Sequence, residues 1–277
     1  MAHIGKMNHL QVIKKKDFGV YLDGENLGEI LLPTRYLPEN CKVQDWLDVF
    51  IYLDSNDLLI ATTDTPYVMV DQCAYLKVVD VNDMGAFLDW GLPKDLLVPY
   101  NQQDKPMQPG HSYVVFVYLD ESTNRIAASS RLSRFLSEES DYFETGEAVQ
   151  LLICGETELG YKAVINNLHL GLIYHSEVFT PLRYGQSIQG YIKNIRDDGK
   201  IDLTLQLPSE RTRDTLGAQI LAHLEAHGGT STLTDKSPPE QIYQQFGVSK
   251  ASYKKAIGAL YKARLIRIDK DKISLCI

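Results

Sequence analysis

Aromatic residues recur in and beside short glycine-containing segments at three places in the chain. They are Phe18 and Tyr21 in the first place, Phe87 in the second, and Tyr161 and Tyr174, with His175 adjacent, in the third. Single-stranded nucleic acid is bound by aromatic rings on which bases stack, since every base has a π-face. Alternation along a strand sends some such rings into a core instead, so exposure and burial are both open for each. Tyr174 is the strongest candidate, because the polar residues after it indicate an exposed edge.

Basic residues lie close to these aromatics in the sequence. They are Lys14, Lys15 and Lys16 before the first segment, Arg125, Arg131 and Arg134 after the second, and Lys193 and Arg196 in the third. Such side chains would hold the phosphates of a strand whose bases stack nearby. A short lysine run is more often a solvated face than a binding site, so that alternative stays open for residues 14–16.

Catalytic and metal chemistry have little support in the sequence. The four cysteines are far apart and form no CxxC pair, which argues against a zinc site. His223 and His227 are four residues apart, the spacing that brings two side chains together on a helix, but no third ligand accompanies them. Phosphate-loop, nucleophile-elbow and HExxH motifs are missing. We therefore expect a non-enzyme without cofactor or metal.

Internal repetition indicates which elements position the aromatics. VFIYLD at residues 49–54 returns as VFVYLD at 115–120, each followed by a polar turn and a second strand. The offset of 66 predicts that Phe50 superposes on Phe116 and Ala61 on Ala127. A diverged third copy spans 187–205, with Asp198-Gly199 in its hairpin turn.

Each copy also has an earlier hairpin whose first strand carries a glycine. The first strands are FGVYL, MGAFL and LGYKAV, and the second strands span 28–33, 94–99 and 171–177. About five short strands in some 60–70 residues are typical of a small closed barrel of the OB type, which leaves no exposed sheet edge. The prediction is a mainly β chain with three tandem OB-like barrels at 1–65, 66–140 and 141–210.

The period changes to that of helices in the last part of the chain, residues 211–277. Gly228-Gly229 ends a first helix, Ser237 before two prolines resembles the cap of a second, and Ser249 can cap a third over 250–263. Two short strands follow, at 265–268 and 272–275. This pattern predicts a winged helix-turn-helix, an α/β domain.

Charge and helix geometry bear on what this domain contacts. Residues 212–277 have a net charge of +4 and residues 1–211 one of −12, within a total of −8. On the third helix, Ser252, Lys254, Lys255 and Lys262 fall opposite or beside the apolar face. Lysine and serine suit contact with a phosphate backbone better than base readout. A domain that contacts only protein is the alternative.

The three glycine-containing hairpins resemble the S1 domain, an OB-fold RNA-binding module named after a ribosomal protein. With the winged helix behind them, the whole chain resembles the bacterial conserved virulence factor B family, also called YitL-like. The resemblance implies an RNA-binding regulator without a catalytic site. Repeats one and two differ from typical S1 domains, because Leu32-Pro33 and Val98-Pro99 replace a histidine-containing stretch.

We therefore predict a regulator that binds single-stranded RNA and acts after transcription. Two other hypotheses remain: a transcription factor that binds DNA through its winged helix, and a protein-interaction scaffold. No segment reaches the ~20 apolar residues of a membrane span, and the first residues lack a signal-peptide core. The cytosol is the expected compartment.

Overall fold

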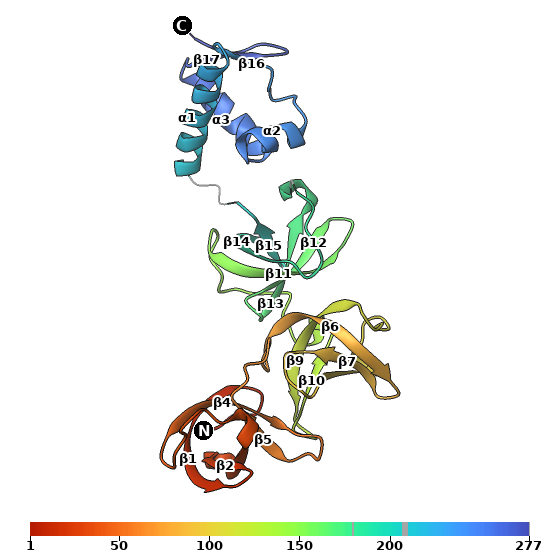
Figure 1. The fold of residues 1–277 in the computed structure, drawn as a ribbon. Helices are drawn as coiled ribbons and strands as arrows, with labels where there is room; N and C mark the ends of the chain where they lie inside the picture. Colours follow the sequence, from red (N-terminus) through yellow and green to blue (C-terminus); the bar gives the residue numbers. More distant parts are fainter. Residues whose placement is uncertain (179, 207–209, 277) are drawn as a thin grey trace. The chain divides into compact units, whose positions relative to one another are not determined.

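The computed structural model describes residues 1–178, 180–206 and 210–276, and the side chains of these except 210–215 (Figure 1). By backbone proximity the chain divides into two compact units. The first holds residues 1–138 with 164–170 and 184–186, and the second holds the remainder. The predicted architecture is confirmed: three five-stranded closed barrels precede a small helical domain. No helix of the described residues is long and apolar enough to cross a membrane.

The first two barrels share one strand order. Barrel 1 is closed in the order β1-β2-β3-β5-β4, and barrel 2 repeats it as β6-β7-β8-β10-β9. The strands of barrel 1 are β1 Met7–Lys16, β2 Gly19–Asp23, β3 Glu29–Pro33, β4 Trp46–Leu53 and β5 Leu59–Thr62. Those of barrel 2 are β6 Cys73–Asn82, β7 Gly85–Asp89, β8 Leu96–Pro99, β9 Ser112–Asp120 and β10 Arg125–Ser129. Alternate residues of β3 and β8 fill the interior, whereas β4 and β9 each bury four consecutive residues.

Barrel 3 follows the same order, β11-β12-β13-β15-β14. Its strands are β11 Ala148–Glu156, β12 Gly160–Ile165, β13 His169–Tyr174, β14 Ser187–Ile195 and β15 Ile201–Thr204. The second hairpin strand ends at Tyr174, and His175–Glu177 form a 3-10 turn instead of continuing it. The strand that the sequence predicts over 171–177 therefore begins two residues earlier, at His169, and ends three residues earlier, at Tyr174.

The glycine of each first hairpin strand is required by a close backbone crossing. A Cβ on Gly19, Gly85 or Gly160 would overlap the carbonyl oxygen of a residue on the next strand, well inside the 3.0 Å that real Cβ atoms keep. The contacted residues are Leu32, Val98 and Ile173 respectively. Glycine is used where two backbones approach this closely, so the three hairpins are built on one principle.

The repeat register is correct for one pair and wrong for the other. Phe50 and Phe116 hold matching positions, opposite Met7 and Cys73 on the first strands. Phe50 pairs with Thr62, however, whereas Phe116 pairs with Ser129, an offset of 67. Ala61 therefore matches Ala128, not Ala127. Leu53 pairs with Leu59, six residues on, whereas the equivalent Leu119 pairs with Ile126, seven residues on, and this extra residue shifts the second strand by one.

Barrels 1 and 2 share a core within the first unit. Phe50 and Tyr52 of β4 lie in one hydrophobic cluster with the interior of barrel 2. The Trp90 ring meets the Phe50 ring edge-on, with centroids 5.6 Å apart. Lys94 adds polar links, since its Nζ donates to the carbonyl oxygens of Leu53 and Asp54 at 2.9 and 2.7 Å. Burial of large aromatic surface makes these two barrels one body.

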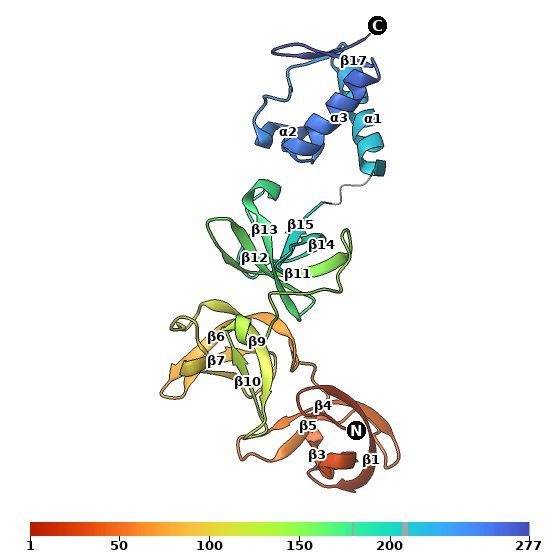
Figure 2. The same ribbon diagram turned by 180° about the vertical axis from the view of Figure 1, so that it is seen from behind.

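The helical domain has the predicted winged-helix elements. Its helices are α1 Glu210–Ala226, α2 Pro239–Phe246 and α3 Lys250–Lys262, and β17 Ile266–Ile268 and β18 Ile273–Leu275 form the wing. Figures 1 and 2 both show α3 between α1 and α2. A short strand that the sequence did not indicate, β16 Thr230–Ser231, pairs with β18.

Two of the three predicted helix signals hold. Ser249 caps α3 by accepting a hydrogen bond from the Ser252 amide at 2.9 Å, and α1 ends at Ala226, just before Gly228 and Gly229 with left-handed φ values of 70° and 82°. Ser237 does not cap α2, because the cap residue is Pro238, with Pro239 in the first turn. The Ser237 hydroxyl instead accepts from the Thr234 amide.

Candidate nucleic-acid interface

One outward face recurs on all three barrels. We call Gly19, Gly85 and Gly160, at the start of each first hairpin strand, the hinge glycines. The residue two positions after each one points away from the core, and these residues are Tyr21, Phe87 and Lys162. Gly19 pairs with Pro33 and Gly85 with Pro99 across the hairpins, and a Cβ on Gly160 would also approach the Cα of Tyr174. These positions belong to the β2–β3 surface, and its equivalents, through which OB folds bind oligonucleotides. We call this surface the outer face.

The outer face of barrel 1 carries an open aromatic pair. Phe18 is 56% exposed, and its ring meets the Tyr21 ring edge-on at 6.3 Å. Lys14 Nζ lies 5.3 Å from the centre of the Tyr21 ring and bonds to the Glu29 carboxylate at 3.0 Å. A base can stack on either ring, and the cation beside them is already shared with a carboxylate.

The other two lysines of the run point elsewhere. Lys15 Nζ donates to the carbonyl oxygen of Cys41 at 3.2 Å, and Lys16 is exposed at the end of β1. The structure therefore brings Lys14, but not Lys15, to the aromatic pair.

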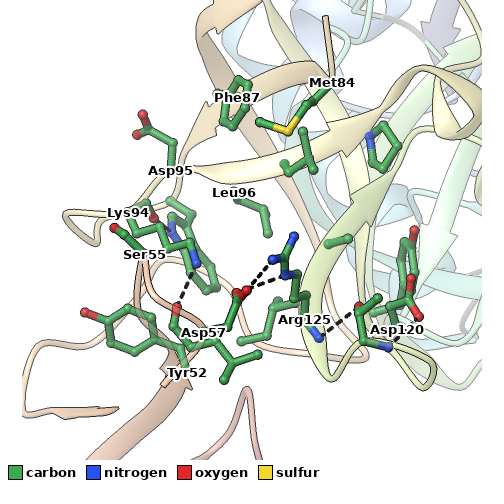
Figure 3. A pocket seen from close by; sticks show the side chains of 18 residues that line it. Tyr52, Ser55, Asp57, Met84, Phe87, Lys94, Asp95, Leu96, Asp120 and Arg125 are labelled. Carbon is green, nitrogen blue, oxygen red and sulfur yellow. Dashed lines mark hydrogen bonds and ion pairs between the residues drawn. The ribbon is translucent and has the colours of Figure 1, made fainter. Parts of the chain in front are cut away.

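The outer face of barrel 2 is part of a pocket of 630 Å³ (Figure 3). Met84, Phe87, Leu97 and Pro99 of barrel 2 supply apolar lining, and Ser55 and Asp57 of the β4–β5 turn of barrel 1 contribute a wall. Phe87 is half-buried, and its cross-strand partner is Asp80. The pocket needs both barrels.

An ion pair joins the two sides of this pocket. Arg125 donates through Nε and Nη2 to the two carboxylate oxygens of Asp57, at 3.0 and 2.5 Å. The hydrogen bond from Arg125 lowers the pKa of Asp57, and the carboxylate raises the pKa of Arg125. Burial lowers the pKa of Lys94 nearby. Asp95 lies in the same pocket, and there burial and the charges of Asp89 and Asp80 raise its pKa.

The other two candidate arginines of barrel 2, Arg131 and Arg134, differ in how accessible their side chains are to a ligand. The guanidinium of Arg131 donates through Nε to the carbonyl oxygen of Gln103 at 3.0 Å, and the residue is half-buried. Arg134 is exposed on a 3-10 turn. Arg131 thus has a structural bond, whereas Arg134 is accessible to a phosphate.

The outer face of barrel 3 concentrates charge around one ring. Lys193 Nζ and the Arg196 guanidinium each lie 5.7 Å from the centre of the half-buried Tyr174 ring. Arg196 Nη2 also donates to the Tyr174 hydroxyl at 2.8 Å. These distances are typical of cation–π contacts, and the two cations fix the ring where a base could stack.

Both cations are also paired with carboxylates. Arg196 bonds to Asp202 at 2.6 Å, and this hydrogen bond raises the pKa of Arg196. Lys193 bonds to Glu177 at 2.8 Å. A phosphate that approaches Tyr174 would compete with these carboxylates, which limits the electrostatic gain from binding.

Of the two alternatives that the sequence leaves open for Tyr161, the structure shows burial, which removes this residue as a stacking candidate. Its side chain is 8% exposed, because the residue directly after the hinge glycine points inward, as Val20 and Ala86 do in the other barrels. His175 packs edge-on against Tyr161 at 5.2 Å, and its ring nitrogen Nε2 lies 3.1 Å from the Thr157 carbonyl oxygen. His175 is exposed, so it can still contact a ligand beside Tyr174.

The winged-helix candidates lie on the predicted side of α3. Tyr253, Ala256, Ile257 and Leu260 are buried, as the helical period predicts, whereas Lys254, Lys255 and Lys262 are exposed. Ser252 is half-buried and engaged by Ser249, whose hydroxyl donates to the Ser252 hydroxyl at 2.8 Å. The three lysines, without Ser252, form the accessible cationic face of α3.

The histidine pair of α1 has protein partners. The His223 and His227 rings lie 4.2 Å apart, and the two ring nitrogens of His223 lie 3.2 Å from Ser231 Oγ and Gln245 Nε2. Burial and the neighbouring His227 lower the pKa of His223. Within the described residues, no cluster of three or more His, Cys, Asp or Glu side chains could hold a metal.

Several residues of the interface were not found from the sequence. Met84, Pro99 and Asp57 line the pocket of barrel 2, and Lys162 lies on the outer face of barrel 3. Alternation counted from the hinge glycine would have found Lys162. No local signal marks Asp57, because its partner Arg125 is 68 residues away in another barrel.

Comparison with known families defines the class of the protein. The S1 domain family matches residues 4–64 and 72–130, and the CvfB-like winged helix domain family matches residues 218–275. The matched parts contain the first two barrels and most of the winged helix. The chain is therefore a multidomain protein of nucleic-acid-binding S1 domains and a winged helix, and neither is a catalytic domain family.

The particular family follows from full-length relatives: the chain belongs to the conserved virulence factor B family, which includes YitL. It is 30% identical to the uncharacterized protein YitL of Bacillus subtilis, with 93% of this chain and 89% of YitL covered. It is 28% identical to conserved virulence factor B of Staphylococcus aureus strain N315, with coverages of 98% and 94%. A crystal structure from Streptococcus pneumoniae, described as a multidomain protein with nucleic acid binding domains, is 25% identical at a TM-score of 0.41, with coverages of 99% and 98%.

Proposed function

We propose that this protein binds single-stranded RNA through the outer faces of its barrels and regulates gene expression after transcription in the bacterial cytoplasm. Its modules would be 1–65, 66–140, 141–210 and 211–277, and none would be catalytic. The observation that carries the proposal is Tyr174, an aromatic ring on the outer face of barrel 3 with Lys193 and Arg196 each 5.7 Å from its centre. Stacking with adjacent cations is the usual mode of single-strand binding.

Two further observations support this proposal. Barrel 1 offers Phe18 and Tyr21 beside Lys14, and the exposed α3 lysines add sequence-independent phosphate contacts. The name of the Staphylococcus aureus relatives, conserved virulence factor B, is compatible with a role in gene control.

Titration of the full chain with single-stranded RNA, single-stranded DNA and duplex DNA at one salt concentration tests the proposal. We expect the RNA to bind most tightly, because the 2′-hydroxyl distinguishes it from DNA of the same sequence. Tight binding of duplex DNA without RNA binding would contradict the proposal.

A transcription factor that acts through the winged helix is the second candidate function. Lys254, Lys255 and Lys262 favour it, since they lie on the helix that enters the major groove in proteins of this fold. The same face lacks the Arg, Asn and Gln side chains that read base edges, so we rank this candidate second.

A further inference from the structure

The pocket on barrel 2 has features that the other outer faces lack. Its lining comes from two barrels, and its 630 Å³ falls in the range of sites that enclose a small ligand. Figure 3 shows Phe87 and Met84 at one end and the Asp57–Arg125 pair at the other. A flat group that stacks on Phe87 would be enclosed on several sides.

The charges around this pocket disfavour a phosphate. Asp80 is the cross-strand partner of Phe87, and Asp57, Asp95 and Asp120 line the pocket. The nearby cations are both engaged, Arg125 by Asp57 and Lys94 by two carbonyl oxygens. An uncharged base fits this environment better than the backbone that carries it.

The Asp57–Arg125 pair can offer hydrogen bonds to such a base. Both side chains are about half exposed, at 49% and 54%. Asp57 is ionised at neutral pH, because Arg125 lowers its pKa, and it therefore acts only as an acceptor. Arg125 keeps donors on Nη1 that the pair does not use. Both Asp57 oxygens face the Arg125 fork. A base that bonds to both oxygens therefore has to take the place of the fork, and the released guanidinium can then donate to the same base.

We propose that this pocket takes one guanine base of a single strand, stacked on Phe87 and read at its edge by Asp57 and Arg125. Guanine has two adjacent donors, N1–H and N2–H₂, which match the two oxygens of a carboxylate. Its neighbouring acceptor O6 matches a guanidinium. Adenine, cytosine and uracil do not combine two adjacent donors with an acceptor on this edge. The inference rests on the proposed function, because it assumes that a strand reaches the barrels.

Base preference is the readout that separates this role from a purely structural one. We would titrate the full chain with short uridine oligoribonucleotides that carry a single central guanosine, adenosine, cytidine or uridine. The guanosine probe should bind about tenfold more tightly than the others, the usual scale of a bidentate base contact. Asp57→Asn replaces one acceptor with a donor and should bring the guanosine probe to within about twofold of the uridine probe.

Asp48→Asn is the matched control. Asp48 is an exposed aspartate of the same barrel that is paired with His9 and lies outside the pocket, so its variant should keep the guanine preference. Thermal melts of both variants should show that the barrels stay folded.

The outcomes separate this inference from the proposed function. Equal binding of all four probes, or a guanine preference that survives in Asp57→Asn, would overturn the inference while the proposed function stands. If no probe binds, the proposed function is wrong as well. A preference that Asp57→Asn removes and Asp48→Asn retains would support the assignment.

Discussion

Barrels 2 and 3 place different chemistry at matching positions of one fold. Phe87 on the outer face of barrel 2 corresponds to Lys162 in barrel 3, and Pro99 corresponds to Tyr174. Ala127, opposite Leu97, corresponds to Asp202, opposite Leu172. Barrel 2 thus offers an apolar, partly enclosed face with acidic neighbours. Barrel 3 offers a tyrosine with charges of both signs around it.

The interior positions of the same two barrels have hardly diverged in character. Val98 and Ile173 are fully buried next to the hinge contacts, and Ala128 and Leu203 are fully buried at matching places on the last strands. Burial of apolar surface is the main source of stability, so these positions have to be apolar for either barrel to fold. Outer-face residues such as Phe87 and Lys162 are half-buried or exposed and contribute less to this apolar core. They can therefore differ between the barrels and contact different ligand groups.

Substitution of the hinge glycines should have the largest effect and test whether the two barrels share one construction. Gly85→Val and Gly160→Val each force a side chain onto a carbonyl oxygen of the next strand. We expect each to destabilise its own barrel by about 4 kcal/mol or more, the scale of severe core disruption. Amide hydrogen exchange reads each barrel separately, so protection should be lost in β7 and β8, or in β12 and β13.

Gly28→Ala is the control for this comparison. Gly28 has φ 76°, but a Cβ there would have nothing within 4 Å. Because φ 76° with ψ −156° is a backbone region used essentially by glycine, it should cost about 1–3 kcal/mol from backbone strain alone, without a clash. If Gly160→Val left exchange in barrel 3 unchanged, the shared hairpin construction would be wrong.

The parts of the molecule that follow local rules could be predicted from the sequence. The strands of the barrels and the buried face of α3 follow from periods of 2 and 3.6 residues. The burial of Tyr161 was predictable as well, since it follows its glycine as Val20 follows Gly19. The one-residue shift between Ala61 and Ala127 was not, because strand register depends on how each turn closes. The pocket depends on Asp57 meeting Arg125 across two barrels, which no local pattern encodes.

Removal of the outer-face ring of barrel 2 or of barrel 3 should have the next largest effect, a loss of RNA affinity. It tests whether each of these two barrels stacks a base. Tyr174→Ala and Phe87→Ala should each weaken binding of single-stranded RNA by about 1–3 kcal/mol. Tyr174→Phe is the control: it keeps the ring, loses the acceptor for Arg196, and should cost about 1 kcal/mol or less. Fluorescence anisotropy titrations measure all three variants. If Tyr174→Ala leaves the affinity for single-stranded RNA unchanged, bases do not stack on Tyr174 of barrel 3.

The salt dependence of binding should change less, and it compares the barrels with the winged helix. Lys14, Arg125, Lys193 and Arg196 are each paired with a carboxylate, so few counterions are released when RNA binds. We expect the shallow slope of roughly two to four phosphate contacts. Lys255→Ala with Lys262→Ala should lower that slope by about two and weaken all sequences alike.

Whether the losses of binding free energy add is a second test of the comparison between the barrels and the winged helix. The loss from the double lysine variant should add to that of Tyr174→Ala, because the sites belong to separate domains. A steep slope in the intact protein would show that the carboxylate partners do not shield these cations. An unchanged slope in the double lysine variant would exclude the α3 face from the RNA site.

The smallest expected effect concerns the acidic character of barrel 2. Burial, then the charges of Asp89 and Asp80, raise the pKa of Asp95 above its ordinary 3.8. The folded protein therefore holds this proton more tightly than the unfolded chain does. The contribution of Asp95 to stability is then greatest at low pH and falls as pH rises from about 3.8 through the folded pKa. Asp57 in the same pocket has a lowered pKa, so its contribution has the opposite sign and is lost as pH falls.

Asp95→Asn should consequently stabilise the protein at pH 7, by a few degrees in Tm at most since the side chain is exposed. The gain should shrink toward zero near pH 3, where Asp95 is protonated in both states. Asp80→Asn should reproduce part of the gain, because it removes one of the two like charges, whereas Asp83→Asn, outside the pocket, should not. Thermal melts at the two pH values measure each variant. A gain that is equal at both would show that the charge of Asp95 is not the cause.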